Sequence, residues 1–148
     1  MPAAYGVPVD ASGAERLPWS EVERWLTDAR SYWVSTSRPD GRPHAAPVWG
    51  LWRGGALVFS TSRGSRKGRN LAASPEVVIH TGSGDEVAIL EGVVAEVELT
   101  AELADAYEAK YALRPEPDPA NVWYELRPRA AQTWRERDFT SSAARWAF

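Results

Sequence analysis

The chain of 148 residues contains no cysteine, two histidines and no long apolar run. Without cysteine, disulfide bonds, thiolate metal sites and cysteine nucleophiles are excluded. Neither His44 nor His80 has a Glu-x-x-His partner, and no Gly-x-Ser-x-Gly elbow is present, which argues against a zinc centre and a serine hydrolase. No apolar stretch approaches the roughly 20 residues of a membrane span, and the N-terminus lacks the features of a secretory signal. We therefore expect a cytoplasmic protein with no bound metal and no membrane contact.

The length fits one domain with a substantial core, since 44% of the residues are hydrophobic. We expect a single domain over residues 1–148, with an N-terminal extension at 1–18 and a C-terminal tail at 138–148. The tail is rich in aromatic and cationic residues, so we expect it to pack on something such as a second subunit. Eight tryptophans, spread along the chain, are expected mostly in the core or in an interface. The formal net charge of -3 argues against a nucleic-acid partner.

The apolar periodicity and the turn residues predict a mainly β structure with flanking helices. Helices are predicted at 21–29 with a Ser20–Glu23 capping box, at 66–73 after Ser65, and at 101–111 after Thr100. Strands are predicted in β-branched and aromatic runs at 31–37, 44–52, 56–61, 76–81, 86–99, 122–126 and 130–135. Pro47 indicates an edge or a bulge, and Gly92 indicates a bend. Short antiparallel strands joined by turns are typical of a barrel or a sandwich.

The segment from Phe59 to Leu71 carries the strongest chemical signal. It places four cations, two glycines and several hydroxyl side chains between a predicted strand and a predicted short helix. Hydroxyl groups, guanidinium groups, a lysine charge and free amides at a helix start can all converge on a phosphate. A solvated surface turn explains the spacing equally well, because no Walker-type or Rossmann-type glycine pattern is present.

The chain offers no obvious acid–base set for catalysis. His80 is typical of an ordinary strand histidine, and His44 is retained as a candidate catalytic residue because it precedes the bulge-prone segment 45–49. A phosphate cradle with many aromatic residues and few acid–base groups favours a bound cofactor that carries the chemistry itself. Flavins and deazaflavins are the leading candidates, since their ring needs mainly shape, stacking and backbone hydrogen bonds from the protein.

Five motifs follow one another in a distinctive order: Arg38–His44, Pro47–Gly50, Phe59–Thr61, Ser65–Leu71 and Ser74–Pro75. In this order the chain resembles the pyridoxamine 5'-phosphate oxidase-like split β-barrel superfamily, and within it the small actinobacterial flavin and deazaflavin oxidoreductases. The likeness covers residues 20–100 best, and the closing segment 144–148 is also similar to that of short members. The resemblance implies an antiparallel, Greek-key-like, FMN-binding split β-barrel with flanking helices.

The resemblance also implies a site. Arg66 and Lys67 match the Ser-Arg-Lys motif whose cations bind the cofactor phosphate, and segment 67–70 resembles the Lys-x-Arg-Asn signature of the deazaflavin-using branch. Residues 60–61 match a pair that contacts the cofactor, and 45–50 match the strand whose backbone faces the ring. Because the cofactor of this superfamily lies at a two-fold dimer interface, C-terminal residues are expected to reach the partner's site. The expected cofactor-binding residues are Ala45, Pro47, Val48, Trp49, Gly50, Ser60, Thr61, Ser65, Arg66, Lys67, Arg69, Asn70, Trp134, Arg145 and Trp146.

The resemblance favours a homodimeric oxidoreductase that uses coenzyme F-420 or FMN to move a hydride to or from a small conjugated or aromatic substrate. Oxidation of pyridoxamine phosphate is not expected, because the vitamin B6 oxidases carry an Arg-x-His element near their C-terminus and this chain has no histidine after His80. The alternative is a non-catalytic FMN-binding module that stores, senses or carries redox equivalents. A third interpretation, binding of single-stranded nucleic acid through residues 63–69, conflicts with the acidic balance of the chain.

Overall fold

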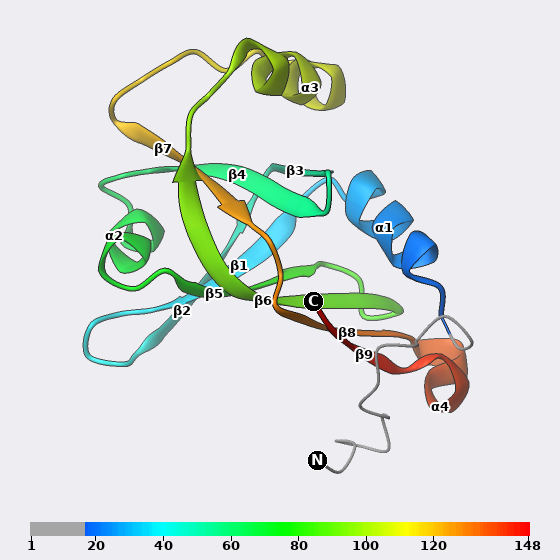
Figure 1. The fold of residues 1–148 in the computed structure, drawn as a ribbon. Coiled ribbons are helices and arrows are strands. Elements are labelled where there is room, and N and C mark those ends of the chain that lie inside the picture. The colour runs from blue at the N-terminus through cyan, green and yellow to red at the C-terminus, as the bar shows by residue number, and fades with distance from the viewer. Residues whose placement is uncertain (1–16) are drawn as a thin grey trace.

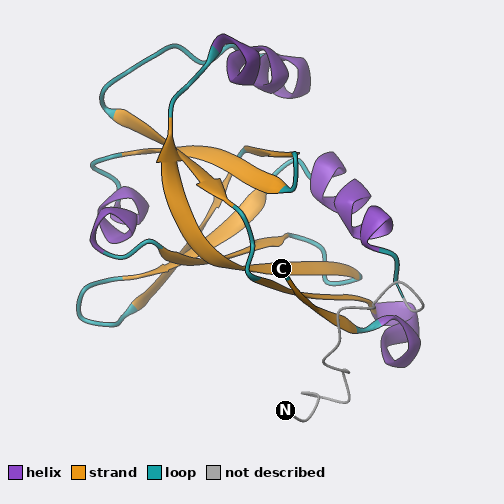
Figure 2. Cartoon of the chain, viewed as in Figure 1, coloured by secondary structure: helices purple, strands orange, loops and turns teal. Residues whose placement is uncertain are grey.

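Antiparallel strands form most of the structure, and helices flank them (Figures 1 and 2). The computed structural model describes residues 17–148, so the expected N-terminal extension lies outside the described residues except at its last two positions. The helical elements are α1 (Trp19–Asp28), α2 (Arg66–Ala73), α3 (Ala101–Tyr111), a short 3-10 helix η3 (Glu136–Asp138) and α4 (Phe139–Ser142). The strands are β1 (Tyr32–Ser37), β2 (Pro43–Val48), β3 (Gly50–Arg53), β4 (Ala56–Ser62), β5 (Glu76–Thr81), β6 (Glu86–Val97), β7 (Asn121–Leu126), β8 (Ala130–Arg135) and β9 (Ala144–Ala147).

The strands form two curved sheets that share β6. Sheet 1 has the order β2-β1-β5-β6-β8-β9, and sheet 2 has the order β6-β7-β4-β3. Every one of these pairings is antiparallel. Together the sheets curl into a half-barrel with helices on its outside, which Figure 1 shows. The predicted mainly β, antiparallel split barrel with flanking helices is confirmed.

Strand β6 is long enough to serve both sheets. Its first part pairs with β5 and β8, and its last part, 94–97, pairs with β7. Gly92 lies next to this change, where a β-carbon would come 2.9 Å from Leu126 Cδ1 and 3.2 Å from the carbonyl oxygen of Arg127. A larger residue would therefore push the end of β7 away from β6. The predicted bend at Gly92 coincides with the passage of β6 between the sheets.

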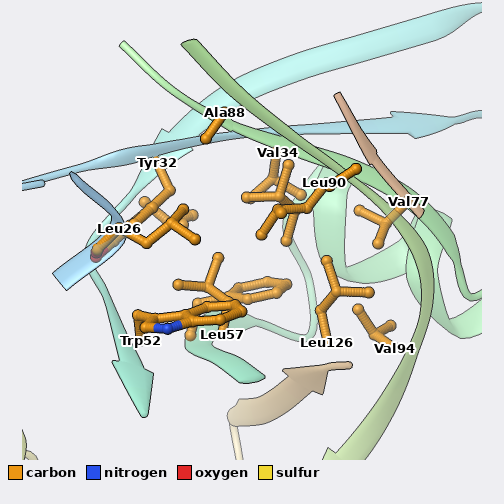
Figure 3. Packing of buried hydrophobic residues seen from close by; sticks show 14 of the residues in the cluster. Leu26, Tyr32, Val34, Trp52, Leu57, Val77, Ala88, Leu90, Val94 and Leu126 are labelled. Carbon is orange, nitrogen blue, oxygen red and sulfur yellow. The ribbon is translucent and has the colours of Figure 1, made fainter. Parts of the chain in front are cut away.

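The core lies between the two sheets, where their inward-facing residues meet (Figure 3). Alternate residues of a strand point to the same face, so each strand contributes every second side chain to this core. The side chains of Tyr32, Val34, Leu57, Ile79, Leu90 and Leu126 are fully buried. Each such apolar side chain stabilises the fold by roughly 1.5–3 kcal/mol relative to an exposed one.

Helix α1 begins two residues earlier than predicted. Pro18, at φ -60°, precedes the first turn, and no side chain caps the helix. The Ser20–Glu23 capping box is therefore wrong, because Ser20 already lies inside the first turn. Glu23 instead accepts a hydrogen bond from Trp52 Nε1 at 2.9 Å, which fastens α1 to sheet 2.

The predicted strand 44–52 is two strands. β2 pairs with β1 in sheet 1, whereas β3 pairs with β4 in sheet 2, and the break falls at Trp49. At Trp49 the chain therefore leaves sheet 1 and enters sheet 2. Pro47 lies on β2, which is an edge strand as predicted, and edge strands are where a sheet tolerates a residue without an N–H.

The C-terminal tail folds onto its own chain. It contains α4 and β9, and β9 pairs with β8 at the edge of sheet 1. The side chain of Trp146 is buried, its Nε1 donates to Thr133 Oγ1 at 2.8 Å, and its ring centre lies 5.0 Å from that of Trp19. The prediction that the tail packs on something is confirmed for its own sheet, and a contact of the tail with a second subunit stays a prediction.

Helix α3 covers the outer face of sheet 2. Thr100 Oγ1 accepts a hydrogen bond from Leu103 N at 3.1 Å, which confirms the predicted cap. Leu103 packs with Val58 and Trp123 in a second apolar cluster on that face. Within residues 17–148, no helix has the length and apolar character needed to cross a bilayer.

Candidate functional site

The predicted phosphate-binding segment is a tight loop between β4 and α2. Ser65 Oγ donates to the carbonyl oxygen of Ser62 at 2.7 Å, accepts from Gly68 N at 3.0 Å and lies 3.1 Å from Thr61 Oγ1. Ser65 therefore caps α2 as predicted. Because its hydroxyl is already engaged in the loop, the cations and amides of α2 are the groups left to hold a ligand.

Gly68 allows α2 to lie directly on this loop. A β-carbon at this position would come 2.2 Å from the carbonyl oxygen of Ser62 and 3.1 Å from that of Arg63. Only glycine fits such a close approach of helix to loop. This close approach could not be found from the sequence, because the contact involves backbone atoms whose approach no linear pattern records.

The cations of the loop separate into two groups. Arg63 is engaged, because its Nη2 donates to Glu96 Oε1 at 2.6 Å and its Nε to the carbonyl oxygen of Pro119 at 3.1 Å. Arg66 and Lys67 form no ion pair within residues 17–148. Burial lowers the pKa of the Lys67 ammonium, which is only half-exposed. These two unpaired cations at the start of α2 are the strongest anion-binding feature of the structure.

The first backbone amides of α2 add to this feature. The N–H groups of Arg66 and Lys67 have no acceptor in the part of the chain that the structure describes, whereas Gly68 N is used by the Ser65 cap. Free amides and the helix dipole both favour an anion at a helix N-terminus. The donor set of this cradle therefore fits a phosphate group.

A second basic element, the tip of the β1–β2 hairpin, lies beside α2. Arg42 Nε donates to Asp40 Oδ2 at 2.9 Å, and Arg38 Nε is buried without a partner in the described chain. The pKa of the Arg66 guanidinium is lowered mainly by Arg69, then by burial, and further by Arg38 and Arg42. The arginines of the hairpin and of α2 thus share one surface that carries more positive than negative charge.

Asn70 does not reach that surface. It is fully buried, and its Nδ2 donates to Thr36 Oγ1 at 3.0 Å, which ties α2 to β1. Asn70 therefore has a structural role in this chain, and its expected contact with a cofactor stays untested. His44 lies opposite Thr36 in the β1–β2 register, so it shares the face that α2 covers, while Ala45 and Pro47 lie exposed on the other face of β2.

The segment from Val48 to Gly50 crosses between the two sheets next to α3. The indole of Trp49 is 38% exposed and is stacked on Tyr111, with ring centres 4.5 Å apart and parallel planes. The Arg30 guanidinium lies 5.1 Å from the centre of the Trp49 ring. The sequence predicted the helix at 101–111 but gave no signal that Tyr111 meets Trp49.

Ser60 lies where the end of β4 meets a surface cavity. Its hydroxyl donates to the carbonyl oxygen of Val122 at 3.1 Å. The cavity, of about 460 Å³, is lined by Ser60, Tyr107, Trp123 and the proline-spaced loop 113–119. Within residues 17–148, no group of three or more histidine, aspartate or glutamate side chains is arranged to hold a metal ion.

The C-terminal candidates lie far from the cradle. Arg145 pairs with Gln132, and Trp134, two residues further along β8, shares that outer face of sheet 1. From β2 to β9 the sheet counts five strand spacings, roughly 24 Å at about 4.8 Å each. Trp146 alternates to the core face and is buried in its own chain, and its expected contact with a partner's site stays untested. Arg145 Nη1 is buried and has no partner in the described chain.

Comparison with known protein families shows to which family the chain belongs. The pyridoxamine 5'-phosphate oxidase family matches residues 19–135, which is more than half of the sequence. The chain belongs to this family. The region matched includes the cradle, the segment 45–50 and the whole of sheet 2, so the predicted resemblance is confirmed at the level of the family.

Two curated relatives are named pyridoxine/pyridoxamine 5'-phosphate oxidase. The protein from Sphingopyxis alaskensis is 34% identical over 143 residues, covering 88% of this chain and 64% of its own length. The protein from Rubrobacter xylanophilus is 28% identical over 137 residues, covering 84% of this chain and 60% of its own length. The chain therefore spans less than two thirds of the length of these relatives, whose names stand against our expectation that it is not such an oxidase.

Solved structures with the same fold have diverse names. General Stress Protein 26 from Bacillus anthracis superposes with a TM-score of 0.65 at 21% identity, covering 86% of this chain and 98% of its own. An F-420 reductase gives a TM-score of 0.56 at 24% identity, covering 84% and 98%. A heme binding protein from Mycobacterium smegmatis gives 0.61 at 24% identity, covering 86% and 55%. At these identities the likeness establishes the fold and leaves the ligand open.

Proposed function

We propose that this protein is an oxidoreductase that binds coenzyme F-420, or alternatively FMN, and transfers a hydride between the cofactor ring and a small conjugated or aromatic substrate. The observation that carries the proposal is the cradle at the start of α2, where Arg66, Lys67 and two free amides converge without an internal partner. A phosphorylated flavin or deazaflavin supplies the hydride chemistry, and an F-420 reductase shares the fold.

The residues of this chain would bind and orient rather than transfer protons. Arg66 and Lys67 would hold the phosphate, and the exposed face of β2 with Ala45 and Pro47 would lie along the ring. Ala45 and Pro47 have no acid–base group, and His44 is turned toward α2. Such an arrangement supports chemistry that resides in the cofactor.

The same geometry supports a homodimer. Trp134 on β8 lies four strand spacings from β2 along sheet 1, roughly 19 Å, and Arg145 on β9 lies five, roughly 24 Å. They would therefore serve the cradle of a second copy rather than their own. The outer face between them carries Trp33, which is 38% exposed, in register with Pro47 on one side and His80 on the other. Light scattering after size exclusion tests this arrangement, and a monomer with full cofactor affinity would contradict it.

The test of the proposed function is titration of the purified protein with FMN and with F-420, followed by absorbance and fluorescence. Arg66→Ala and Lys67→Ala should each weaken binding by about 1–3 kcal/mol, the range for a hydrogen bond to a charged group. Arg63→Gln is the matched control, because Arg63 is already paired with Glu96 and should not affect affinity. Wild-type affinity in both cradle variants would remove the assignment.

Turnover assays then separate the functions that remain. Reduced cofactor with enones, quinones and other conjugated acceptors should give oxidised cofactor. Binding of FMN without turnover would make the protein a non-catalytic redox or carrier module. Pyridoxamine phosphate belongs in the same assay because of the names of the two curated relatives. Oxidation of it would give this chain the activity for which those two relatives are named.

A further inference from the structure

The junction between β2 and β3 is held by the last turn of α3. Tyr111 Oη accepts a hydrogen bond from Gly50 N at 2.9 Å, and its own hydrogen can go to the carbonyl oxygen of Gly50, at 2.8 Å, or of Arg30, at 2.9 Å. Lys110 Nζ donates to the same Gly50 carbonyl oxygen at 3.0 Å. Both backbone polar groups of Gly50 are therefore fixed by side chains that lie sixty residues away in the sequence.

Lys110 connects this junction to the core. Its Nζ donates to Tyr32 Oη at 2.9 Å, and that hydroxyl donates in turn to the carbonyl oxygen of Leu26 in α1. On the other side of the junction, a β-carbon on Gly50 would come 3.0 Å from the Val58 carbonyl oxygen and 3.2 Å from the Tyr32 ring. The backbone at residue 50 thus has little freedom in any direction.

Burial of the charged Lys110 side chain in this network is unfavourable. Burial lowers the pKa of the Lys110 ammonium to about 8, with Asp28 opposing and Arg30 adding to this shift. The groups that face the ammonium are Tyr32 of β1, Tyr111 of α3, and the charges of Asp28 at the end of α1 and Arg30 just after it. Burial raises the pKa of both tyrosines, so they stay protonated and available as donors.

We propose that Lys110 and Tyr111 are positioning residues that hold the Trp49–Gly50 junction, and with it the exposed Trp49 indole, in a fixed place beside the ring of the bound cofactor. This inference rests on the proposed function. Its structural basis is that Trp49 remains 38% exposed and yet stacks on Tyr111, while the Arg30 guanidinium lies 5.1 Å from the centre of the Trp49 ring and 5.4 Å from that of the Tyr111 ring. An exposed tryptophan that is held by a stacked ring and a fixed neighbouring backbone is suited to meet a ligand.

The test compares Tyr111→Phe and Lys110→Met with Tyr107→Phe as the matched control. Tyr111→Phe keeps the ring that stacks on Trp49 and removes the hydrogen bonds, and Lys110→Met keeps an unbranched side chain without its donor. Tyr107 lies on the same helix, and its hydroxyl makes no hydrogen bond within residues 17–148. The first readout is the fluorine NMR signal of Trp49 in protein labelled with 5-fluorotryptophan, assigned through Trp49→Phe. The second is the dissociation constant for FMN and F-420.

We expect both test variants to shift and broaden the Trp49 resonance and to weaken cofactor binding by about 3–10-fold, the range for one lost hydrogen bond. Tyr107→Phe should match wild type in both readouts. A Lys110→Arg variant restores a donor and should recover part of the affinity.

Three outcomes decide the inference. An unmoved Trp49 resonance, or wild-type affinity in both test variants, overturns it while the proposed function stands. An equal loss of affinity in Tyr107→Phe also overturns it, because the effect would then belong to α3 as a whole. If wild-type protein binds neither cofactor, the proposed function fails, and the inferred positioning of Trp49 is then accepted or rejected on the fluorine resonance alone.

Discussion

Gly68→Ala tests the geometry of the cradle most directly. In an ordinary exposed helix this change stabilises the protein by about 1 kcal/mol, because alanine is the better helix former. Here the new β-carbon would lie 2.2 Å from the Ser62 carbonyl oxygen, so helix and loop would have to separate by about 1 Å. We therefore expect the opposite sign to the one that helix propensity predicts.

The magnitude follows from what that separation disturbs. The loop is held by the hydrogen bond from Arg63 N to the carbonyl oxygen of Ala120 at 2.8 Å, and by the Ser65 cap with its contacts at 2.7 and 3.0 Å. Overpacking of this kind costs about 1–3 kcal/mol, and a lost net hydrogen bond about 1 kcal/mol. After subtraction of the helix-propensity gain, we expect a net loss of about 2 kcal/mol.

The assay is urea unfolding followed by circular dichroism, with Gly64→Ala as the control in the same loop. Gly64 has open space, since the nearest atom to its β-carbon would be Ser62 Oγ at 4.0 Å, so its replacement should be neutral or slightly stabilising. Gly68→Ala should also weaken cofactor binding, because Arg66 and Lys67 move with the helix. If Gly68→Ala is as stable as wild type, the close packing of α2 on its loop is refuted, and so is the cradle built on it.

Three further predictions concern the charges and the tail. The pKa of Lys110 falls from 10.5 in the unfolded chain to about 8 in the folded protein. The free energy of unfolding of wild type should therefore increase relative to that of Lys110→Met as the pH rises from 8 to 10.5. Urea titrations at both ends of this range measure the difference, and parallel pH profiles of the two proteins would contradict the prediction. The double change Arg42→Gln and Arg69→Gln should weaken F-420 more than FMN, since F-420 carries carboxylates beyond its phosphate; equal losses in titrations with both cofactors would reject this. Trp146→Phe should lower stability by about 1–3 kcal/mol by stranding the buried Thr133 hydroxyl, while gel filtration and cofactor titration remain unchanged, as expected of a core residue.

Local sequence patterns predicted most of the helices and strands, but they did not predict which strands pair with one another. Ser65 and Thr100 cap their helices because a cap needs only residues three positions apart. The break at Trp49 could not be found in this way, since the run 44–52 has continuous strand character and the turn is imposed by packing of Gly50 against Val58 and Tyr32. Strand propensity depends on the local sequence, whereas the sheet that a strand joins depends on contacts with distant parts of the chain.

In the candidate site too, some residues could be found from the sequence and others only from the structure. Arg66 and Lys67 could be named from the sequence because their motif is contiguous and their charge is not paired elsewhere. Asn70 belongs to the same motif, but the helix turns it toward Thr36 and buries it, and a linear motif does not record that rotation. Lys110 meets Gly50 only because α3 covers sheet 2, so no pattern within either segment could have indicated their contact.

The two edges of sheet 1 bear on how many chains a complete site needs. The cradle adjoins the edge strand β2, and the outward-facing Trp134 and Arg145 lie on β8 and the opposite edge strand β9. In a dimer with two-fold symmetry the same face of both copies meets itself, so the β2 edge of one copy can oppose the β9 edge of the other. The outer face between these edges would suit such a contact, because it presents Trp33 to solvent. A dimer of this kind would bring cations from two chains around one cofactor, and its formation and cofactor binding would then be linked, each strengthening the other.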